Sequence, residues 1–160
     1  MSAFTPEARL EAIGLSLPPP PAAVANYVGL VMVGKLAFVS GHGPVENGEL
    51  IYRGKLGRDM DVDTGKKSAQ LTILNLLATL KAEIGELDRV ERVVKLLVMV
   101  NSAPDFADQP FVANGASDLL VEIFGLERGR HARSAVGLGA LPFGISVEIE
   151  GIFEIRDLGR

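Results

Sequence analysis

The amino-acid sequence predicts a two-layer α+β domain in which two helices cover one face of a mixed β-sheet. Two segments repeat apolar side chains every three or four residues, as helices do, and several shorter runs are rich in valine, isoleucine and leucine, as buried strands are. The 160 residues match the usual size of one domain, and 48% hydrophobic residues are enough for a core. We therefore expect a single domain over residues 1–160, with an N-terminal helix and proline-rich arm at 1–21 and a core at 22–155.

The first predicted elements are a short helix, an extended arm and a hairpin. Residues 5–13 have the amphipathic pattern of a short helix, and the four consecutive prolines at 18–21 then impose a polyproline segment. This arm either lies on the body of the domain or only leads into the first strand. Tyr27–Val33 and Leu36–Val39 are predicted to be strands, because Gly34-Lys35 between them is a two-residue hairpin signal.

The middle of the chain combines turns with the first long helix. We expect Ser40–Pro44 to bend away from the end of the second strand, since it contains two glycines. A turn at Glu46–Glu49 should then lead into a short strand at Leu50–Arg53. From about Asp63 to Glu83 the apolar spacing is helical, and Gly85 is expected to end this helix.

The second half of the chain supplies the remaining strands and the second helix. Val90–Val100 is dense in valine and leucine and is predicted to be a buried strand. A helix should begin after Asp108, with Pro110 in its first turn, and end at Gly125. Two last strands are expected near Ser134–Gly139 and Ser146–Ile155. If both helices lie on one sheet face, the other face stays uncovered by this chain, which usually means oligomerisation.

Two of the predicted strands carry side chains that suggest chemistry. Alternation in the last strand puts apolar residues on one face and Glu148, Glu150 and Glu154 on the other. Arg133 lies at the start of the preceding strand. If these two strands pair, its guanidinium and a carboxylate approach each other on one sheet surface, where they can bind a small anion and handle its protons. The alternative is a structural ion pair between Arg133 and Glu148 or Glu150.

Composition argues against several other kinds of site. The chain has no cysteine, which removes disulfides, thiolate catalysis and cysteine-bound metals. The two histidines lack metal-ligand spacing, so we expect no metal; His131 should border Arg133, and His42 should form a cleft wall. A net charge of −4 gives no general attraction to nucleic acid. Gly54–Arg58 lacks the phosphate-loop pattern and is expected to be a mobile loop.

Neither a membrane segment nor a signal peptide is expected. The stretch MSAFTPEARLEAIGL has early acidic residues and no long apolar centre, unlike a secretory signal. The most apolar run, Val24–Val33, is too short to span a bilayer. We therefore expect a soluble cytoplasmic protein.

Several short motifs, taken together in their order and spacing, resemble one family. Tyr27-Val28 stands thirteen residues before Ser40-Gly41, a long helix follows, and then come Ala132-Arg133-Ser134, Leu141-Pro142 and Val147–Glu150. Over about residues 22–155 the chain resembles the RidA/YjgF family of reactive-intermediate (imine and enamine) deaminases, also called endoribonuclease L-PSP. The resemblance implies a chorismate-mutase-like fold and a homotrimer whose sheets pack into a central barrel, with three ligand clefts between neighbouring subunits.

The resemblance also implies roles for individual residues. Arg133 matches the arginine that holds the substrate carboxylate, and Glu148 matches a carboxylate near the reacting water. The other matched positions line the cleft: Tyr27, Ser40, Gly41 and, from a helix, Asn114. No organic cofactor or metal is implied, because hydrolysis of an imine needs only an anchored acid group, a protonated nitrogen and a delivered water.

We therefore expect a hydrolytic deaminase that converts small imines or enamines derived from amino acids into 2-keto acids and ammonia. Two alternatives are a non-catalytic trimeric protein that binds small carboxylates in the same cleft, and a ribonuclease, which the net acidity disfavours. The sequence departs from the best-known family members at Ala135, where they often carry cysteine, at the longer segment Asn101–Val112, and in the longer extension through Pro21. These departures bear on the substrate more than on the fold.

Overall fold

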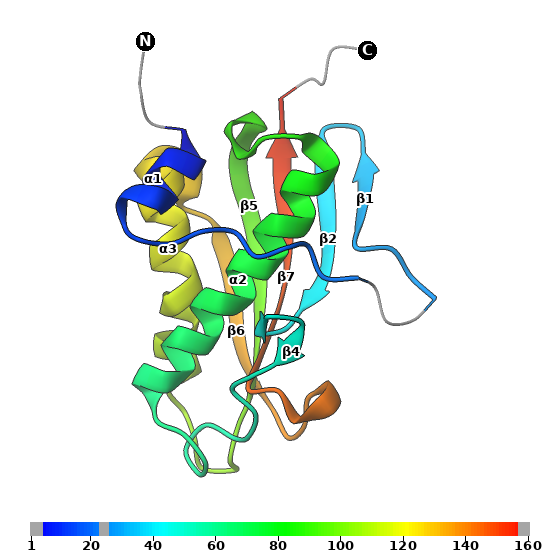
Figure 1. The fold of residues 1–160 in the computed structure, drawn as a ribbon. Helices are drawn as coiled ribbons and strands as arrows, with labels where there is room; N and C mark the ends of the chain where they lie inside the picture. Colours follow the sequence, from blue (N-terminus) through cyan, green and yellow to red (C-terminus); the bar gives the residue numbers. More distant parts are fainter. Residues whose placement is uncertain (1–4, 23–25, 157–160) are drawn as a thin grey trace.

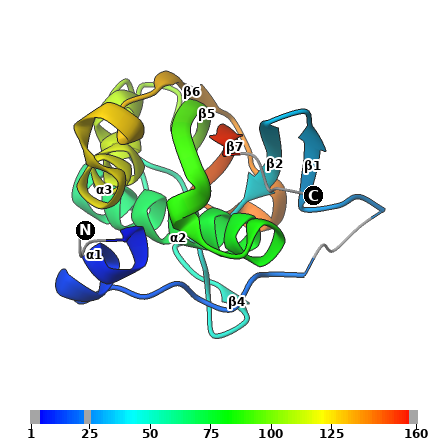
Figure 2. The same cartoon turned by 90° about the horizontal axis from the view of Figure 1, so that it is seen from above.

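Two long helices cover one face of a five-stranded sheet in the computed structural model, which describes residues 5–22 and 26–156. The helices are α2 (Val62–Ile84) and α3 (Gln109–Gly129), and both lie on the same side of the sheet (Figures 1 and 2). This confirms the predicted two-layer α+β architecture. Residues 1–4 and the first two residues of the apolar run Val24–Val33 lie outside the described range. Within that range, the helices are all too short or too polar to cross a bilayer.

The order of strands in the sheet is β1-β2-β7-β5-β6, and only the pair β5–β6 is parallel. The strands are β1 (Leu30–Val33), β2 (Leu36–His42), β5 (Val90–Asn101), β6 (Ala132–Leu138) and β7 (Val147–Ile155). The strands that carry Arg133 and Glu148 therefore do not pair, because β5 lies between them. The prediction of a direct pairing was wrong: a parallel partner for β5 was not apparent from the alternation within each strand.

The two faces of the sheet differ as expected. On β7, Val147, Ile149 and Phe153 are fully buried under the helices, whereas the glutamates that alternate with them point to the other face. That second face, which we call the open face, exposes several large apolar side chains: Val31, Val33, Phe38 and Val136. Burial of such a surface against another copy would remove it from water.

Several predicted boundaries differ from the structure, and strand β1 begins at Leu30 rather than at Tyr27. Strand β2 continues through Ser40, Gly41 and His42, because a bulge between Val39 and His42 absorbs the bend that was expected there. The strand predicted at residues 50–53 is shorter, forming a small hairpin of β3 (Val45–Glu46) and β4 (Glu49–Leu50). Helix α3 continues for one more turn beyond Gly125, whose φ of 81° breaks its regular geometry.

Glycines and caps explain how the two helices pack and end. Asp61 caps α2 by accepting a hydrogen bond from the Thr64 amide at 2.8 Å, and Gly85 ends α2 with a φ of 93°. Gly115 of α3 lies directly against the backbone carbonyl of Lys66 on α2, so any side chain at this position would collide with α2. The backbone of α3 can therefore approach α2 closely.

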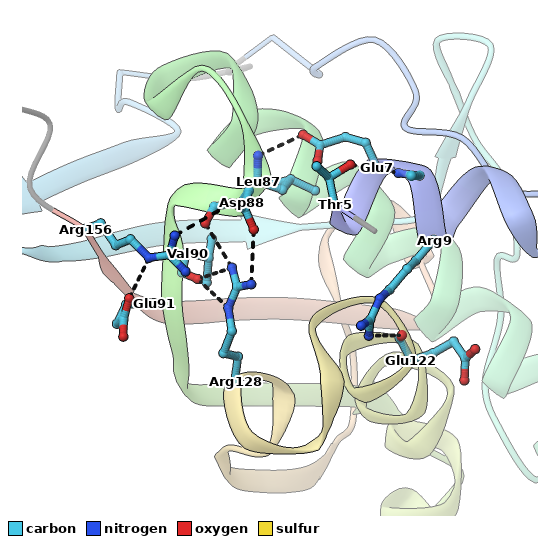
Figure 3. A network of polar contacts seen from close by, with 11 residues as sticks. Thr5, Glu7, Arg9, Leu87, Asp88, Val90, Glu91, Glu122, Arg128 and Arg156 are labelled. Atoms are coloured by element: carbon cyan, nitrogen blue, oxygen red, sulfur yellow. Dashed lines mark hydrogen bonds and ion pairs between the residues drawn. The ribbon is translucent and has the colours of Figure 1, made fainter. Parts of the chain in front are cut away.

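The N-terminal segment is docked on the end of this two-helix layer. Helix α1 (Pro6–Ala12) places the Glu7 carboxylate 2.8 Å from the Leu87 amide, and Arg9 donates to the Glu122 carbonyl (Figure 3). Lys81 Nζ lies 3.1 Å from the same Glu7 carboxylate. After α1, Leu15 and Leu17 pack against the core, and the chain then runs across α2 (Figure 1). Of the two alternatives for the arm, the structure supports an arm that lies on the body.

The same end of the domain holds a cluster of arginines and carbonyl groups. Arg128, on the last turn of α3, donates to the Val90 carbonyl at 3.0 Å and to Asp88 at 3.1 Å (Figure 3). Asp88 belongs to the short 3-10 helix η1 (Leu87–Arg89), and Arg156 extends the cluster to Glu91. A second 3-10 helix, η2 (Pro142–Gly144), precedes β7. The cluster ties the end of α3 to the start of β5. Arg133, by contrast, contacts the first half of α3.

Candidate functional site

Arg133 lies on β6 with its side chain against the first half of α3. Its Nη1 donates to Asn114 Oδ1 at 2.9 Å and to Ser117 Oγ at 3.0 Å, and its Nη2 donates to the Pro110 carbonyl at 3.3 Å. The structure therefore brings together Arg133 and Asn114, two of the predicted site residues. Ser117 was missed by sequence reasoning, although its position three residues after Asn114 places it on the same face of α3.

The guanidinium of Arg133 retains donors for a ligand. Three of its five N–H groups are used by the contacts above, which leaves Nε and one hydrogen of Nη2. Among residues 5–22 and 26–156, no carboxylate pairs with Arg133, so the alternative of an ion pair with Glu148 or Glu150 is not found within the chain. Two remaining donors suit the two oxygens of a carboxylate.

His131 completes this arrangement, which we call the arginine half-site: Asn114, Ser117, His131 and Arg133. The Nδ1 of His131 lies 2.7 Å from the Gly129 carbonyl, and its Nε2 lies 2.9 Å from Ser117 Oγ. Burial lowers the pKa of His131, and the nearby charge of Arg133 acts in the same direction, against a hydrogen bond to Gly129 that raises the pKa. The structure thus places His131 beside Arg133, as predicted.

Glu148 lies against the backbone of Gly41 on the open face. A Cβ added to Gly41 would lie 3.1 Å from the Glu148 carboxyl carbon and would overlap its Oε1, so the carboxylate can occupy this position only because residue 41 is glycine. Burial raises the pKa of Glu148, and the charge of Glu150 on the same face adds to this effect. A carboxyl group with a raised pKa exchanges protons more readily near neutral pH.

Ser40 precedes Gly41 on β2 and holds the segment that contains Tyr27. The Ser40 hydroxyl donates to the Val28 carbonyl at 2.7 Å, and its amide donates to the Gly29 carbonyl at 2.9 Å. These bonds tie the segment that holds Tyr27, whose side chain is 46% exposed, to β2. They also use the Ser40 amide, so this group has no hydrogen left for a ligand. We call Tyr27, Ser40, Gly41 and Glu148 the glutamate half-site.

His42 and the loop at Gly54–Arg58 have structural roles in the chain. His42 is only 7% exposed, and its ring lies 2.6 Å from the Ser40 carbonyl and 2.7 Å from Thr79 Oγ1 on α2. The expectation that it forms a cleft wall was wrong, because it points toward the helix layer and supports the bulge in β2. The 54–58 loop is anchored rather than free, since Leu56 is fully buried and Lys55 Nζ contacts Asn101 Oδ1 at 2.8 Å.

The two half-sites lie on opposite faces of the sheet. Arg133 is in register with Leu96, which is buried under the helices, whereas Glu148 is in register with Met99 on the open face. Side chains of paired residues point to the same side, and successive residues point to opposite sides. The expectation that Arg133 and Glu148 meet on one sheet surface was therefore wrong for a single chain.

A separate groove of about 360 Å³ crosses the middle of the open face. Apolar side chains from several strands line it, among them Val31, Phe38 and Ile152, together with the charged Lys95 and Glu150. The groove contains Ser40 of the glutamate half-site but neither Glu148 nor Arg133. Across the described residues, no group of three or more histidines, aspartates and glutamates is arranged to hold a metal ion.

The relationship to known proteins agrees with this fold. A family model described as "YjgF/chorismate mutase-like, putative endoribonuclease" matches residues 7–147. The chain belongs to this family. The match confirms the RidA/YjgF resemblance and, together with solved structures, the chorismate-mutase-like fold. The homotrimer and the individual site residues stay predictions.

Two similar proteins match most of the chain. Protein TCP17 of Trypanosoma cruzi is 44% identical over 150 residues, which cover 94% of each chain. The crystal structure of the protein Atu1372 from Agrobacterium tumefaciens is 45% identical, covers 94% of this chain and 92% of that chain, and has a TM-score of 0.88. Both matches extend over nearly the full length of the chain.

Two less similar solved structures are a RidA protein and a protein with a bound amino acid. RidA from the Antarctic bacterium Psychrobacter sp. PAMC 21119 is 33% identical, with a TM-score of 0.57, and covers 85% of this chain and 94% of that chain. TdcF of E. coli, solved with bound serine, is 25% identical, with a TM-score of 0.62, and covers 86% of this chain and 94% of that chain.

Proposed function

We propose that this protein hydrolyses small imines or enamines derived from amino acids, giving a 2-keto acid and ammonia. The observation that carries the proposal is the state of Arg133, a half-buried guanidinium held by three neutral oxygens, with two donors unused. Such a fork suits a substrate carboxylate, which every 2-imino acid carries next to its reactive carbon. The serine bound by TdcF is a molecule of similar size with the same carboxylate.

The reaction requires one water and a proton donor. Water adds to the carbon of the C=N bond, the C–N bond then breaks, and nitrogen leaves as ammonia while the water oxygen becomes the ketone oxygen. In this proposal Glu148 passes one proton of the attacking water to the nitrogen, which gives a carbinolamine, and then passes the proton of its hydroxyl group to the nitrogen as the C–N bond breaks. Both water protons thus leave with ammonia; an enamine first tautomerises to the imine. The raised pKa of Glu148 suits both directions of transfer.

The proposed site combines the arginine half-site of one copy with the glutamate half-site of a neighbour. Two features support this arrangement. First, the half-sites face opposite sides of the sheet, so one chain cannot close them around a small molecule. Second, the glutamate half-site adjoins exposed apolar residues, including Val31 and Phe38, that a second copy would cover. Tyr27, Ser40, Gly41 and Asn114 would then line the cleft.

The test is ammonia release from an enamine generated in the assay, compared between the wild-type protein and Arg133 variants. Arg133→Ala removes the charged contact, worth roughly 1.5–3 kcal/mol, and should lower kcat/KM by at least one to two decades. Arg133→Lys should restore little, because an ammonium cannot reproduce a two-pronged contact. Arg130→Ala, which removes an exposed arginine three residues earlier, is the matched control and should stay active.

The opposite result would identify Arg133 as structural. An Arg133→Ala protein with a sharply lower melting temperature and full activity contradicts the proposal. If the protein binds 2-oxobutyrate but releases no ammonia from the enamine, the alternative of a non-catalytic carboxylate-binding protein is favoured. The endoribonuclease in the family description has its own test: RNA degradation by the purified protein that is lost in Arg133→Ala.

A further inference from the structure

The hydrogen bonds of Ser117 link the protonation state of His131 to Arg133. Arg133 Nη1 can only donate, so it occupies an acceptor position of Ser117 Oγ. The Gly129 carbonyl can only accept, so the ring nitrogen that faces it, Nδ1 of His131, must carry a proton. Ser117 Oγ keeps one further acceptor position and its own hydrogen, so it can pair with Nε2, 2.9 Å away, in two ways. It donates to Nε2 when His131 is neutral, with its proton on Nδ1, and it accepts from Nε2 when His131 is protonated.

Protonation of His131 would create two neighbouring cations. Its Nε2 and Arg133 Nη1 lie 2.9 and 3.0 Å from the same Ser117 oxygen. The imidazolium and guanidinium charges would thus be within about 6 Å of each other, where partial burial leaves an appreciable repulsion. The lowered pKa of His131, caused by burial and then by Arg133, agrees with this geometry.

Arg133 is the main charged group that acts on His131. Other titratable side chains lie near Ser117 or His131 in sequence or register: Asp118 of α3, next to Ser117; Lys95 of β5, in register with Ala132; and Arg130, which precedes His131. None of these three makes a hydrogen bond or ion pair with His131 in the described part of the chain. Removal of the Arg133 charge, or its neutralisation by a bound anion, should therefore have the largest effect on the pKa of His131.

We propose that Ser117 and His131 couple anion binding at Arg133 to the uptake of one proton by His131. This inference rests on the carboxylate site of the proposed function. An anion on the free donors of Arg133 offsets its positive charge and removes the repulsion that keeps His131 neutral. When Nε2 gains a proton, it donates to Ser117 Oγ, and the serine hydrogen is released to donate elsewhere. The added positive charge on His131 and the freed Ser117 hydrogen both favour an anion at this half-site. Protonation of His131 therefore increases the affinity for the anion, and the bound anion raises the affinity of His131 for its proton.

A first experiment tests the coupling between Arg133 and His131 without any ligand. The chain has only two histidines, so NMR titration of the ring signals is simple, and His131→Gln assigns them. The His131 signal should titrate at a higher pH in Arg133→Ala than in the wild-type protein. Arg130→Ala is the matched control and should move it much less. An unchanged titration in Arg133→Ala overturns the inference.

A second experiment uses 2-oxobutyrate, which stays ionised throughout the pH range. Its affinity for the wild-type protein should become about threefold to tenfold tighter between about pH 8 and about pH 5.5, as expected for a charge at this distance. Calorimetry in buffers of different ionisation heat should detect proton uptake on binding. His131→Gln, which can still accept the Ser117 hydrogen bond but does not titrate in this range, should lose both effects.

The outcomes separate this inference from the proposed function. If 2-oxobutyrate binds without proton uptake, or with proton release, the coupling is wrong and the carboxylate site stands. If 2-oxobutyrate does not bind at all, both the carboxylate site and the anion coupling fail. Proton uptake that persists in His131→Gln assigns the proton to another group and also overturns the inference.

Discussion

Replacing Gly41 with alanine should displace the Glu148 carboxylate and leave the protein folded. The φ angle of Gly41 is not positive, so its backbone conformation is accessible to alanine. The atoms that the new methyl group would meet are the end of a flexible side chain: the Glu148 carboxyl group, with its carbon at 3.1 Å and Cγ at 3.3 Å. Rotation of Glu148 can relieve the overlap, so the stability cost should be about 1 kcal/mol or less.

The expected loss of activity is much larger than the loss of stability. Relief of the overlap with Oε1 requires the carboxylate to move by roughly 1 Å, and a misplacement of this size can lower the rate of a positioned reaction about 100-fold. Gly41→Ala should therefore lower kcat/KM for ammonia release about as far as Glu148→Gln does. The double variant should be no worse than Glu148→Gln alone, because both changes remove the same interaction.

Kinetics and thermal unfolding on the same samples make this test decisive. Gly139→Ala is the matched control: its φ is not positive, a Cβ there meets no atom within 4 Å, and full activity is expected. Full activity of Gly41→Ala would refute the assignment of a role to the Glu148 carboxylate at this position. A large drop in melting temperature would instead show that the carboxylate is locked in place by packing.

Three further predictions address assembly, the docked helix and the loop before α3. Light scattering at micromolar concentration should give about three times the 17.0 kDa chain mass, and a well-folded monomer would contradict the predicted trimer. Burial would raise the pKa of Glu7, but the Leu87 amide and Lys81 outweigh it and lower the pKa, so the carboxylate stabilises the fold above its unfolded-state pKa. Glu7→Gln should therefore lower the melting temperature at neutral pH, with a gap that closes below about pH 4; a gap that is independent of pH would exclude the charge as the cause. Shortening the Asn101–Pro110 segment at its exposed residues 104 and 105 should change ligand preference with little loss of stability, and unfolding without any change in preference would count against a position beside the cleft.

The periodic elements could be predicted from the sequence because each one depends on its own residues. The 3.6-residue spacing in α2, the cap at Gly85 and the hairpin at Gly34-Lys35 are local features, and the structure has all of them. The alternation in β7 predicted one apolar and one polar face, and the apolar face is the one that the helices cover. The family motifs then supplied site residues that periodicity alone does not identify.

The order of the strands could not be predicted in the same way. Alternation shows which residues of a strand share a face, but it does not state which strand is the neighbour. The placement of β5 between β6 and β7 depends on a parallel pairing made possible by the crossover through α3. His42 illustrates the same limit, since its burial depends on Thr79, thirty-seven residues away on α2.

The opposite orientations of Arg133 and Glu148 give the shared site a test that does not depend on stability. Each proposed cleft takes its arginine from one subunit and its glutamate from another. When inactive Arg133→Ala and Glu148→Gln subunits are unfolded, mixed in equal amounts and refolded together, random assembly should restore about one quarter of wild-type clefts, each with both residues intact. Each variant refolded alone is the control and should stay inactive. A site built within one chain predicts no recovery, because every subunit then lacks one of the two residues. Recovery would show that the cleft lies between subunits; its absence, in mixtures proven to contain mixed trimers, would contradict the shared site.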